Sequence, residues 1–337
     1  MRRVDTTSQV RPAATPRAAG LKRFTLDAGP LIALVALVIV FGVASPTFLT
    51  LGNIAILLTQ ISILLVVGIG LTFVILLGSI DLSVEGVMAT SSLVFVLLAA
   101  NDRTPFDLGY FAVLVGVLTG TVFGLVNGLL HVRLGIPSFM VTLGTGAIGL
   151  GVATVLFGGR APQLRDPGLR QWGVGSSFGI SNLVAVAVAA IVVAFLIQHY
   201  TRVGRYGYVI GGDEPVARLS GIDIGRYKIY TFMVSGTTAG LAGVMAATQL
   251  GVGDTSIGGG LLFTAITAVV LGGTLLVGGR GSVLRTLIGA GIITVLANGL
   301  ILIGVNPYIQ TAVQGLVIVL AVVATGWSLR RRVRVVK

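Results

Sequence analysis

Long apolar stretches recur along almost the whole chain, separated by short polar segments. Each stretch is nearly free of charge and approaches the length of roughly 20 residues that an α-helix needs to cross a bilayer. The pattern predicts ten spans, at about 29–44, 53–78, 84–100, 109–130, 138–157, 179–198, 229–249, 259–277, 283–303 and 309–327. The third is short and polar at its start, so a re-entrant segment fits it equally well. The chain is therefore predicted to be an all-α, polytopic transmembrane helical bundle.

Composition supports this fold class, and the basic residues predict the orientation. Hydrophobic residues make up 55% of the chain and charged residues 10%, whereas a soluble domain carries about 25% charged residues. Nineteen of the 23 lysines and arginines lie in the segments 1–28, 131–137, 199–228, 278–285 and 328–337, which the ten-span pattern places on one side. By the positive-inside rule, both termini are predicted to be cytoplasmic. The net charge of +12 thus indicates topology rather than a nucleic-acid partner.

Polar segments flank the expected transmembrane domain, which covers residues 29–327. Residues 1–28 form a basic N-terminal tail without periodicity, which we expect to be disordered, and residues 328–337 form a basic C-terminal tail. The basic stretch, the apolar run and Gly42-Val43-Ala44 also resemble a signal peptide. The long basic region and the spans that follow favour an uncleaved first span.

The residues that enzymes and metal sites need are scarce. The chain has no cysteine, which excludes disulfides and thiolate metal sites, and its two histidines, His131 and His199, lie far apart. None of its three lysines stands in a phosphate-binding loop of the GxxxxGK[ST] type. We therefore expect no catalytic residues, no metal and no cofactor in this chain.

Glycine supplies 49 of the 337 residues and recurs at helical spacing in three spans. The glycines in question are Gly116, Gly120, Gly124 and Gly128 in the fourth span, Gly144, Gly149 and Gly151 in the fifth, and Gly236, Gly240 and Gly243 in the seventh. Small residues at this spacing let helix backbones approach closely. We interpret them as packing faces rather than ligand sites.

One long polar loop, residues 199–228, interrupts the apolar pattern and holds five basic residues. Within it, Asp213 can cap the start of a helix and Gly221 can end it. Glu214 and Arg218 are four residues apart and share one face of that helix. We predict a short exposed helix at the cytoplasmic surface that docks into a groove on a soluble partner. An ordinary solvated loop helix is the alternative.

Uncharged polar residues within the spans are candidates for lining a translocation pathway, because polar groups are expensive in lipid and usually face the bundle interior. The five candidates are Gln60, Asn127, Thr145, Gln249 and Asn298. They suit a neutral polyol better than an ion. Alternatively, such side chains tie helices together, and the sequence does not separate the two roles. For Asp81, beside the third span, we favour capping the helix N-terminus over contact with the solute.

Four segments resemble the ribose/xylose/arabinose-type permeases of bacterial ABC importers. They are GSIDLSVEGVMATSS (78–92), GIPSFMVTLGTGAIGLGVATVLFGGRAP (135–162), GGDEPVARLSGIDIGRYKIYTFMVSGTTAGLAGVM (211–245) and VVLGGTLLVGGRGSVLRTLIGAGII (269–293). They stand in the family's order, and the resemblance covers about residues 30–328. It implies a permease in the bacterial inner membrane that pairs with a second permease copy, a cytoplasmic ATPase that binds the ATP, and an extracytoplasmic sugar-binding protein. It also implies that Glu214, Ala217 and Gly221 belong to the segment that couples permease to ATPase.

The chain departs from the family's pattern at Glu85, where a glycine is usual, and at Phe263 and Thr264, where an acidic residue is often found. These departures weaken any inference about the solute, since relatives of this type also carry autoinducer-2 and other small polar solutes. A secondary transporter driven by an ion gradient is a less favoured alternative, because the span interiors are almost free of charge. A membrane scaffold or receptor would have no use for the coupling-like loop.

Overall fold

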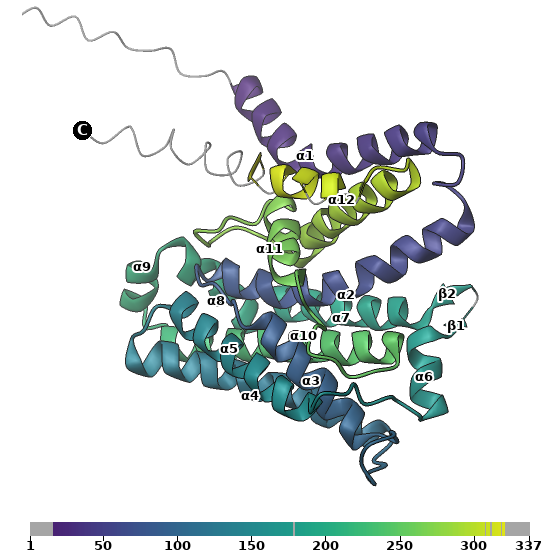
Figure 1. The fold of residues 1–337 in the computed structure, drawn as a ribbon. Coiled ribbons are helices and arrows are strands. Elements are labelled where there is room, and N and C mark those ends of the chain that lie inside the picture. Colours follow the sequence, from purple (N-terminus) through teal and green to yellow (C-terminus); the bar gives the residue numbers. More distant parts are fainter. Residues whose placement is uncertain (1–15, 178, 307, 311, 318, 321–337) are drawn as a thin grey trace, which may run out of the picture.

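The computed structural model describes residues 16–177, 179–306, 308–310, 312–317 and 319–320. Its elements are α1 (Pro16–Ala44), α2 (Leu51–Leu76), α3 (Val84–Leu98), α4 (Tyr110–Leu134), α5 (Ser138–Phe157), α6 (Pro167–Val174), β1 (Ser176–Ser177), β2 (Ile180–Ser181), α7 (Asn182–Tyr200), α8 (Arg202–Gly212), α9 (Glu214–Leu219), α10 (Ile224–Leu250), α11 (Leu261–Leu271) and α12 (Val283–Leu302). The long helices run between two ends of the molecule (Figure 1). One end carries α8 and α9, and the other carries α6 and the β1–β2 hairpin.

Within the described residues, six helices are long and apolar enough to cross a membrane, namely α2, α4, α5, α7, α10 and α12. They correspond to the second, fourth, fifth, sixth, seventh and ninth predicted spans, so the prediction of a helical membrane protein is confirmed. Three further apolar helices are shorter: Ala28–Ala44, α3 and α11. About half of the predicted tenth span, 309–327, lies outside the described residues, and those of its residues that are described are helical.

The third and eighth predicted spans contain helices that cover only part of a membrane. α3 has 15 residues and α11 has 11, so at 1.5 Å per residue they are about 22 and 16 Å long, against a hydrocarbon core of about 30 Å. The predicted 259–277 helix instead stops at Leu271, and Gly272 and Gly273 begin a series of turns. Both spans are therefore completed by irregular backbone.

The N-terminal tail differs from the prediction. α1 begins at Pro16, so residues 16–28 are helical rather than disordered. A proline in the first turn and the alanine, leucine, lysine and arginine that follow favour helix formation, which the absence of apolar periodicity concealed. Residues 1–15 and the C-terminal tail 328–337 lie outside the described residues.

The glycine face of α4 packs directly on α10, as the spacing predicted. A Cβ atom added at Gly120 would clash with the carbonyl oxygen of Gly236, and one at Gly124 would clash with that of Phe232. In α5, Gly149 packs against the backbone of Gly86 in α3, whereas a Cβ atom added at Gly144 or Gly151 would meet no other atom within 4 Å. The α4 and α10 faces are thus packing faces, and the α5 face is so only in part.

We expect Gly120→Ala to destabilise the bundle, because the added methyl group would push α4 and α10 apart. Overpacking of this kind costs about 1–3 kcal/mol, sometimes more. Gly144→Ala, where the space is open, serves as the matched control. Thermal unfolding of the purified protein in detergent measures the difference, and equal melting temperatures for the two variants would contradict a direct backbone contact.

Candidate coupling surface

The polar loop between α7 and α10 folds into two short helices at one end of the bundle. α8 follows α7 with Thr201 as its N-cap, and it lies across the end of α2. Gly211 sits so close to the carbonyl oxygen of Leu76 that a Cβ atom would clash with it. This close approach fixes where α8 ends and therefore where α9 begins.

The helix predicted from the sequence is α9, and its predicted start and end are present. The Asp213 side chain is the N-cap and accepts a hydrogen bond from the backbone N–H of Val216 at 3.1 Å. Gly221 adopts a φ of +77°, the left-handed conformation that glycine tolerates best. The next residue, Ile222, donates its N–H to the carbonyl oxygen of Ala217, which closes the end of the helix.

One face of α9 is anchored in the protein while the opposite face is exposed. Ala217 is completely buried in a cluster with Leu77, Ile210 and Ile224, at the meeting point of α2, α8 and α10. Val216 and Leu219, by contrast, are 54% and 89% exposed. The coupling residues predicted from the sequence include Ala217 but neither of these two exposed apolar residues. Their separation of three residues, on either side of a small residue, was the available signal.

Glu214 joins α9 to the first turns of α10 through an ion pair with Lys228, and it also pairs with Arg218 within α9. Its carboxylate lies 3.0 Å from Nζ of Lys228 and 3.3 Å from a guanidinium nitrogen of Arg218. Partial burial raises the pKa of the Glu214 carboxyl, but the hydrogen bonds and positive charges of Lys228 and Arg218 outweigh this, so its pKa is lowered. The Arg218 pair follows from the spacing, whereas Lys228 is 14 residues away and was not predicted.

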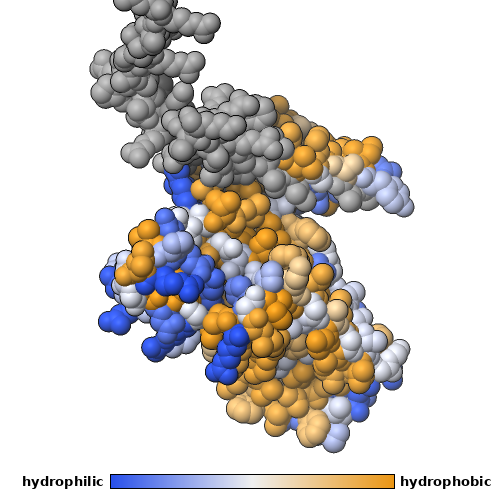
Figure 2. Space-filling view, turned by 90° about the vertical axis from the view of Figure 1, so that its left-hand side faces the viewer, coloured by the Kyte–Doolittle hydropathy of each residue, from blue (hydrophilic) through white to orange (hydrophobic). Residues whose placement is uncertain are grey.

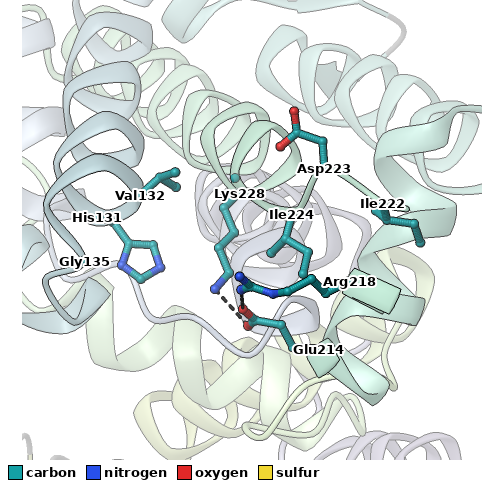
Figure 3. Close-up of a pocket in the computed structure, with 10 residues that line it drawn as sticks. His131, Val132, Gly135, Glu214, Arg218, Ile222, Asp223, Ile224 and Lys228 are labelled. Atoms are coloured by element: carbon teal, nitrogen blue, oxygen red, sulfur yellow. Dashed lines mark hydrogen bonds and ion pairs between the residues drawn. The ribbon is translucent and has the colours of Figure 1, made fainter. Parts of the chain in front are cut away.

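A cavity of about 520 Å³ lies between α9, the end of α4 and the start of α10. Figure 3 shows His131 and Gly135 on one side of it and Glu214 and Arg218 on the other, with Lys228 reaching between them. His131 Nδ1 donates a hydrogen bond to the carbonyl oxygen of Ile136 at 2.7 Å, since a carbonyl can only accept. The cavity is thus lined by charges of both signs.

The molecular surface at this end combines charged and apolar areas. Figure 2 looks onto the end that carries α8 and α9, where hydrophilic residues gather beside hydrophobic ones. A mixture of exposed apolar residues and partly paired charges is suited to contact with another protein. Asp213, Glu214, Ala217, Arg218 and Gly221, the five predicted coupling residues, all lie in α9 or directly beside it.

The predicted pathway residues do not form one cluster. Asn53 and Asn298 exchange two amide hydrogen bonds of 3.0 Å, which tie α2 to α12. Asn127 donates to Ser83 at 2.9 Å and accepts from Thr145, which joins α4 to α5 and to the start of α3. These buried groups have the geometry of ties between helices. Gln60 is exposed on α2, and Gln249 is partly buried near the end of α10.

Asp81 is 1% exposed and precedes α3 without being its N-cap, which is Ser83. One carboxylate oxygen accepts from the backbone N–H and hydroxyl of Ser83, at 2.9 and 2.6 Å, and the other accepts from Ser235 of α10 at 2.7 Å. The expected capping of the helix itself is therefore wrong in detail. Asp81 instead holds the turn that leads into α3 and fastens it to α10.

The amino-acid sequence is similar to a known protein family and to several named proteins over most of its length. Residues 53–322 match the model of the family described as branched-chain amino acid transport system / permease component. The chain is 34% identical over 305 residues to the ribose import permease protein RbsC of Escherichia coli strain K12, covering 89% of this chain and 94% of that protein. It is 37% identical over 296 residues to RbsC of Bacillus subtilis strain 168, covering 87% and 91%.

Two further similarities extend the comparison. The D-allose transport system permease protein AlsC of Escherichia coli strain K12 is 35% identical over 306 residues, covering 87% of this chain and 90% of that protein. Among solved structures, PsaBC from Streptococcus pneumoniae in complex with Fab matches with a TM-score of 0.42 and 16% identity, covering 83% of this chain and 91% of that one.

We expect Lys228→Met to reduce stability at neutral pH and to lose this effect in acid. The partly exposed pair contributes from a few tenths to about 1 kcal/mol. The folded pKa of Glu214 lies below the unfolded value of about 4.3, so the contribution is complete above that pH and disappears as the pH falls through the folded pKa. Thermal unfolding of wild type and variant across about pH 3–7 measures it. In a Glu214→Gln background, the same substitution should show no such pH dependence.

Proposed function

The chain belongs to the family of branched-chain amino acid transport system / permease components, and we propose that it is the membrane subunit of an ATP-driven importer for a small neutral sugar. It is a multi-pass protein of the bacterial inner membrane. Ribose import permeases from two bacteria and a D-allose permease support the solute class, since each is 34–37% identical over most of both chains. A pentose or hexose is the substrate that follows.

The geometry of α9 is the observation that carries the proposed mechanism. Its buried residue, Ala217, fixes the helix to the ends of α2 and α10, while Val216 and Leu219 are left exposed for a partner. A cytoplasmic ATPase that binds these exposed residues would move α9 and the attached helices together. ATP is bound and hydrolysed by that partner, so this chain is not itself an enzyme.

Transport then proceeds by alternating access. Two permease copies enclose the pathway, and a sugar-loaded binding protein docks on the end of the molecule opposite α9. The segments at that end are held by Arg170, which donates to the carbonyl oxygens of Thr248 and Gln249, and by an ion pair between Asp102 and Arg160. Closure of the ATPase dimer on α9 switches the side to which the pathway opens.

The first test of this proposal determines the orientation of the chain in the membrane. Because the chain has no native cysteine, a single introduced cysteine can be labelled without background. Gln163→Cys, at the end of the molecule opposite α9, should react with a membrane-impermeant thiol reagent added to intact cells. Val216→Cys should react only after the membrane is permeabilised, because α9 is expected to be cytoplasmic. Labelling in the reversed pattern would refute both the orientation and contact with a cytoplasmic ATPase.

The second test is the exposed apolar tip of α9. Leu219→Asp should abolish uptake of radiolabelled D-ribose and D-allose in cells that contain the full transport system, because a charge would oppose docking of the partner. Leu219 is 89% exposed, so protein yield and melting temperature should stay at the wild-type level. Leu219→Met, which keeps an apolar side chain, is the matched control and should retain most uptake.

The energy source separates this function from ion-coupled transport. Depletion of ATP with the ion gradient preserved should stop uptake by the wild type, whereas collapse of the gradient with ATP preserved should not. Uptake that follows the gradient, or wild-type uptake by Leu219→Asp, would contradict the proposal.

A further inference from the structure

The short helix α3 starts in the middle of the bundle rather than at its edge. Gly86, in the first turn of α3, packs against the backbone of Gly146 and Gly149. These two glycines lie on either side of the midpoint of α5, a helix of 20 residues that is long enough to span the membrane. Residues 84–86 therefore lie near the centre of the bilayer.

A second interrupted span reaches the same depth from the opposite direction. After α10 ends at Leu250, the chain passes alongside α3, with Gly253 next to Leu93 and Gly258 next to Met88 and Glu85. α11 then begins at Leu261. The non-helical segment that leads into α11 thus meets the first turn of α3 near the middle of the membrane.

Glu85 lies at this meeting point. Its Oε1 atom accepts a hydrogen bond from the backbone N–H of Gly260 at 2.9 Å. Among the described residues this is the only hydrogen bond or ion pair that its side chain makes, so Oε2 remains available. Glu85 is partly exposed, and its neighbours Gly259 and Gly260 are exposed as well. Phe263, in the first turn of α11, is 64% exposed.

A carboxyl group with an open oxygen is costly to place against lipid. Ionisable residues within membrane spans almost always face the bundle interior or a water-filled cavity. Irregular backbone at membrane depth is likewise tolerated only where protein or water covers it. Glu85 is an ionisable residue, and the exposed Gly259 and Gly260 beside it are irregular backbone, so both rules apply to this surface. It therefore faces protein or a water-filled space rather than acyl chains.

We propose that Glu85 lines the solute pathway at mid-membrane and accepts hydrogen bonds through Oε2 from hydroxyl groups of a neutral polyol. This rests on the proposed function, because the solute class is taken from it. A carboxylate only accepts hydrogen bonds, and each sugar hydroxyl can donate one. Its negative charge would also repel phosphorylated sugars and other anions, so the pathway is selective for uncharged solutes.

The proposed role differs from that of the polar residues selected from the sequence. Asn127 and Thr145 use their hydrogen-bonding groups on each other and on Ser83. Both carboxylate oxygens of Asp81 likewise accept hydrogen bonds from groups within the protein. Glu85 alone among these four keeps an oxygen for a ligand.

Access of water is tested with single cysteines in the full chain, expressed with its transport partners in membranes. Glu85→Cys should react with a small charged methanethiosulfonate reagent applied from at least one side of the membrane, because thiolates form only where water reaches them. Val192→Cys is the matched control, since Val192 lies at the middle of α7 and is 50% exposed on an apolar face. If Glu85→Cys reacts no faster than Val192→Cys from either side, the proposal is overturned.

Contact with the solute is tested by two substitutions, of which Glu85→Gln retains the acceptor for Gly260. Glu85→Gln keeps an acceptor for Gly260 but replaces the open oxygen with an NH2 group, which only donates. The hydrogen bond from a sugar hydroxyl to a charged acceptor is then lost, so uptake of D-ribose or D-allose should fall about tenfold. Glu85→Asp keeps the carboxylate and should retain more uptake than Glu85→Gln. Wild-type uptake by Glu85→Gln would overturn the sugar contact.

The two proposals fail in different ways. A wild-type chain that imports neither sugar, with Glu85→Cys still labelled, refutes the assigned sugar and leaves a water-filled pathway at Glu85. ATP-dependent sugar uptake with an unreactive Glu85→Cys refutes only the role of Glu85.

Discussion

The need to satisfy every backbone N–H and C=O group away from water governs this structure most strongly. The chain interrupts α-helical hydrogen bonding before α3, where residues 79–83 are non-helical and yet enclosed by α5 and α10. Side chains replace the missing partners: Ser138 accepts from the N–H of Ile80 at 3.0 Å, and Thr142 accepts from that of Leu82 at 2.9 Å. These two hydroxyl residues of α5 are therefore what makes the interrupted span possible.

α10 connects this interrupted region to the surface at α9. Its first turns carry Ile224, which packs on Ala217, and Lys228, which pairs with Glu214. Two turns further along, Ser235 donates to Asp81 in the segment that precedes α3. The glycine contacts with α4 hold the same helix without intervening side chains. A force applied to α9 thus acts on a helix that is rigidly attached to the middle of the bundle.

The lengths of the apolar stretches and the residues that start and end helices predicted most of the fold from the sequence alone. Six predicted spans correspond to long helices, and Asp213 and Gly221 delimit α9 as their residue types indicate. The early end of α11 was not predicted, because residues 272–277 are as apolar as the helical residues before them. Packing against a segment distant in sequence ends the helix there. Gly272 lies against the backbone of Arg285 at the start of α12, a contact that no local pattern contains. The Glu214–Lys228 pair was missed for the same reason.

Hydrogen-bond saturation separates structural from functional polar groups in this bundle. The amides of Asn53 and Asn298 are buried and bonded to each other, so a solute that displaced either amide would break existing bonds. The cost of leaving a buried partner unpaired would then oppose binding. A pathway needs contacts with the solute that are weak and readily reversible. Such contacts arise from side chains that water already reaches and that keep an acceptor oxygen without a partner in the protein. Residue type alone identifies structural and pathway residues alike as polar and intramembrane. Only their hydrogen-bond partners in the structure distinguish the two roles.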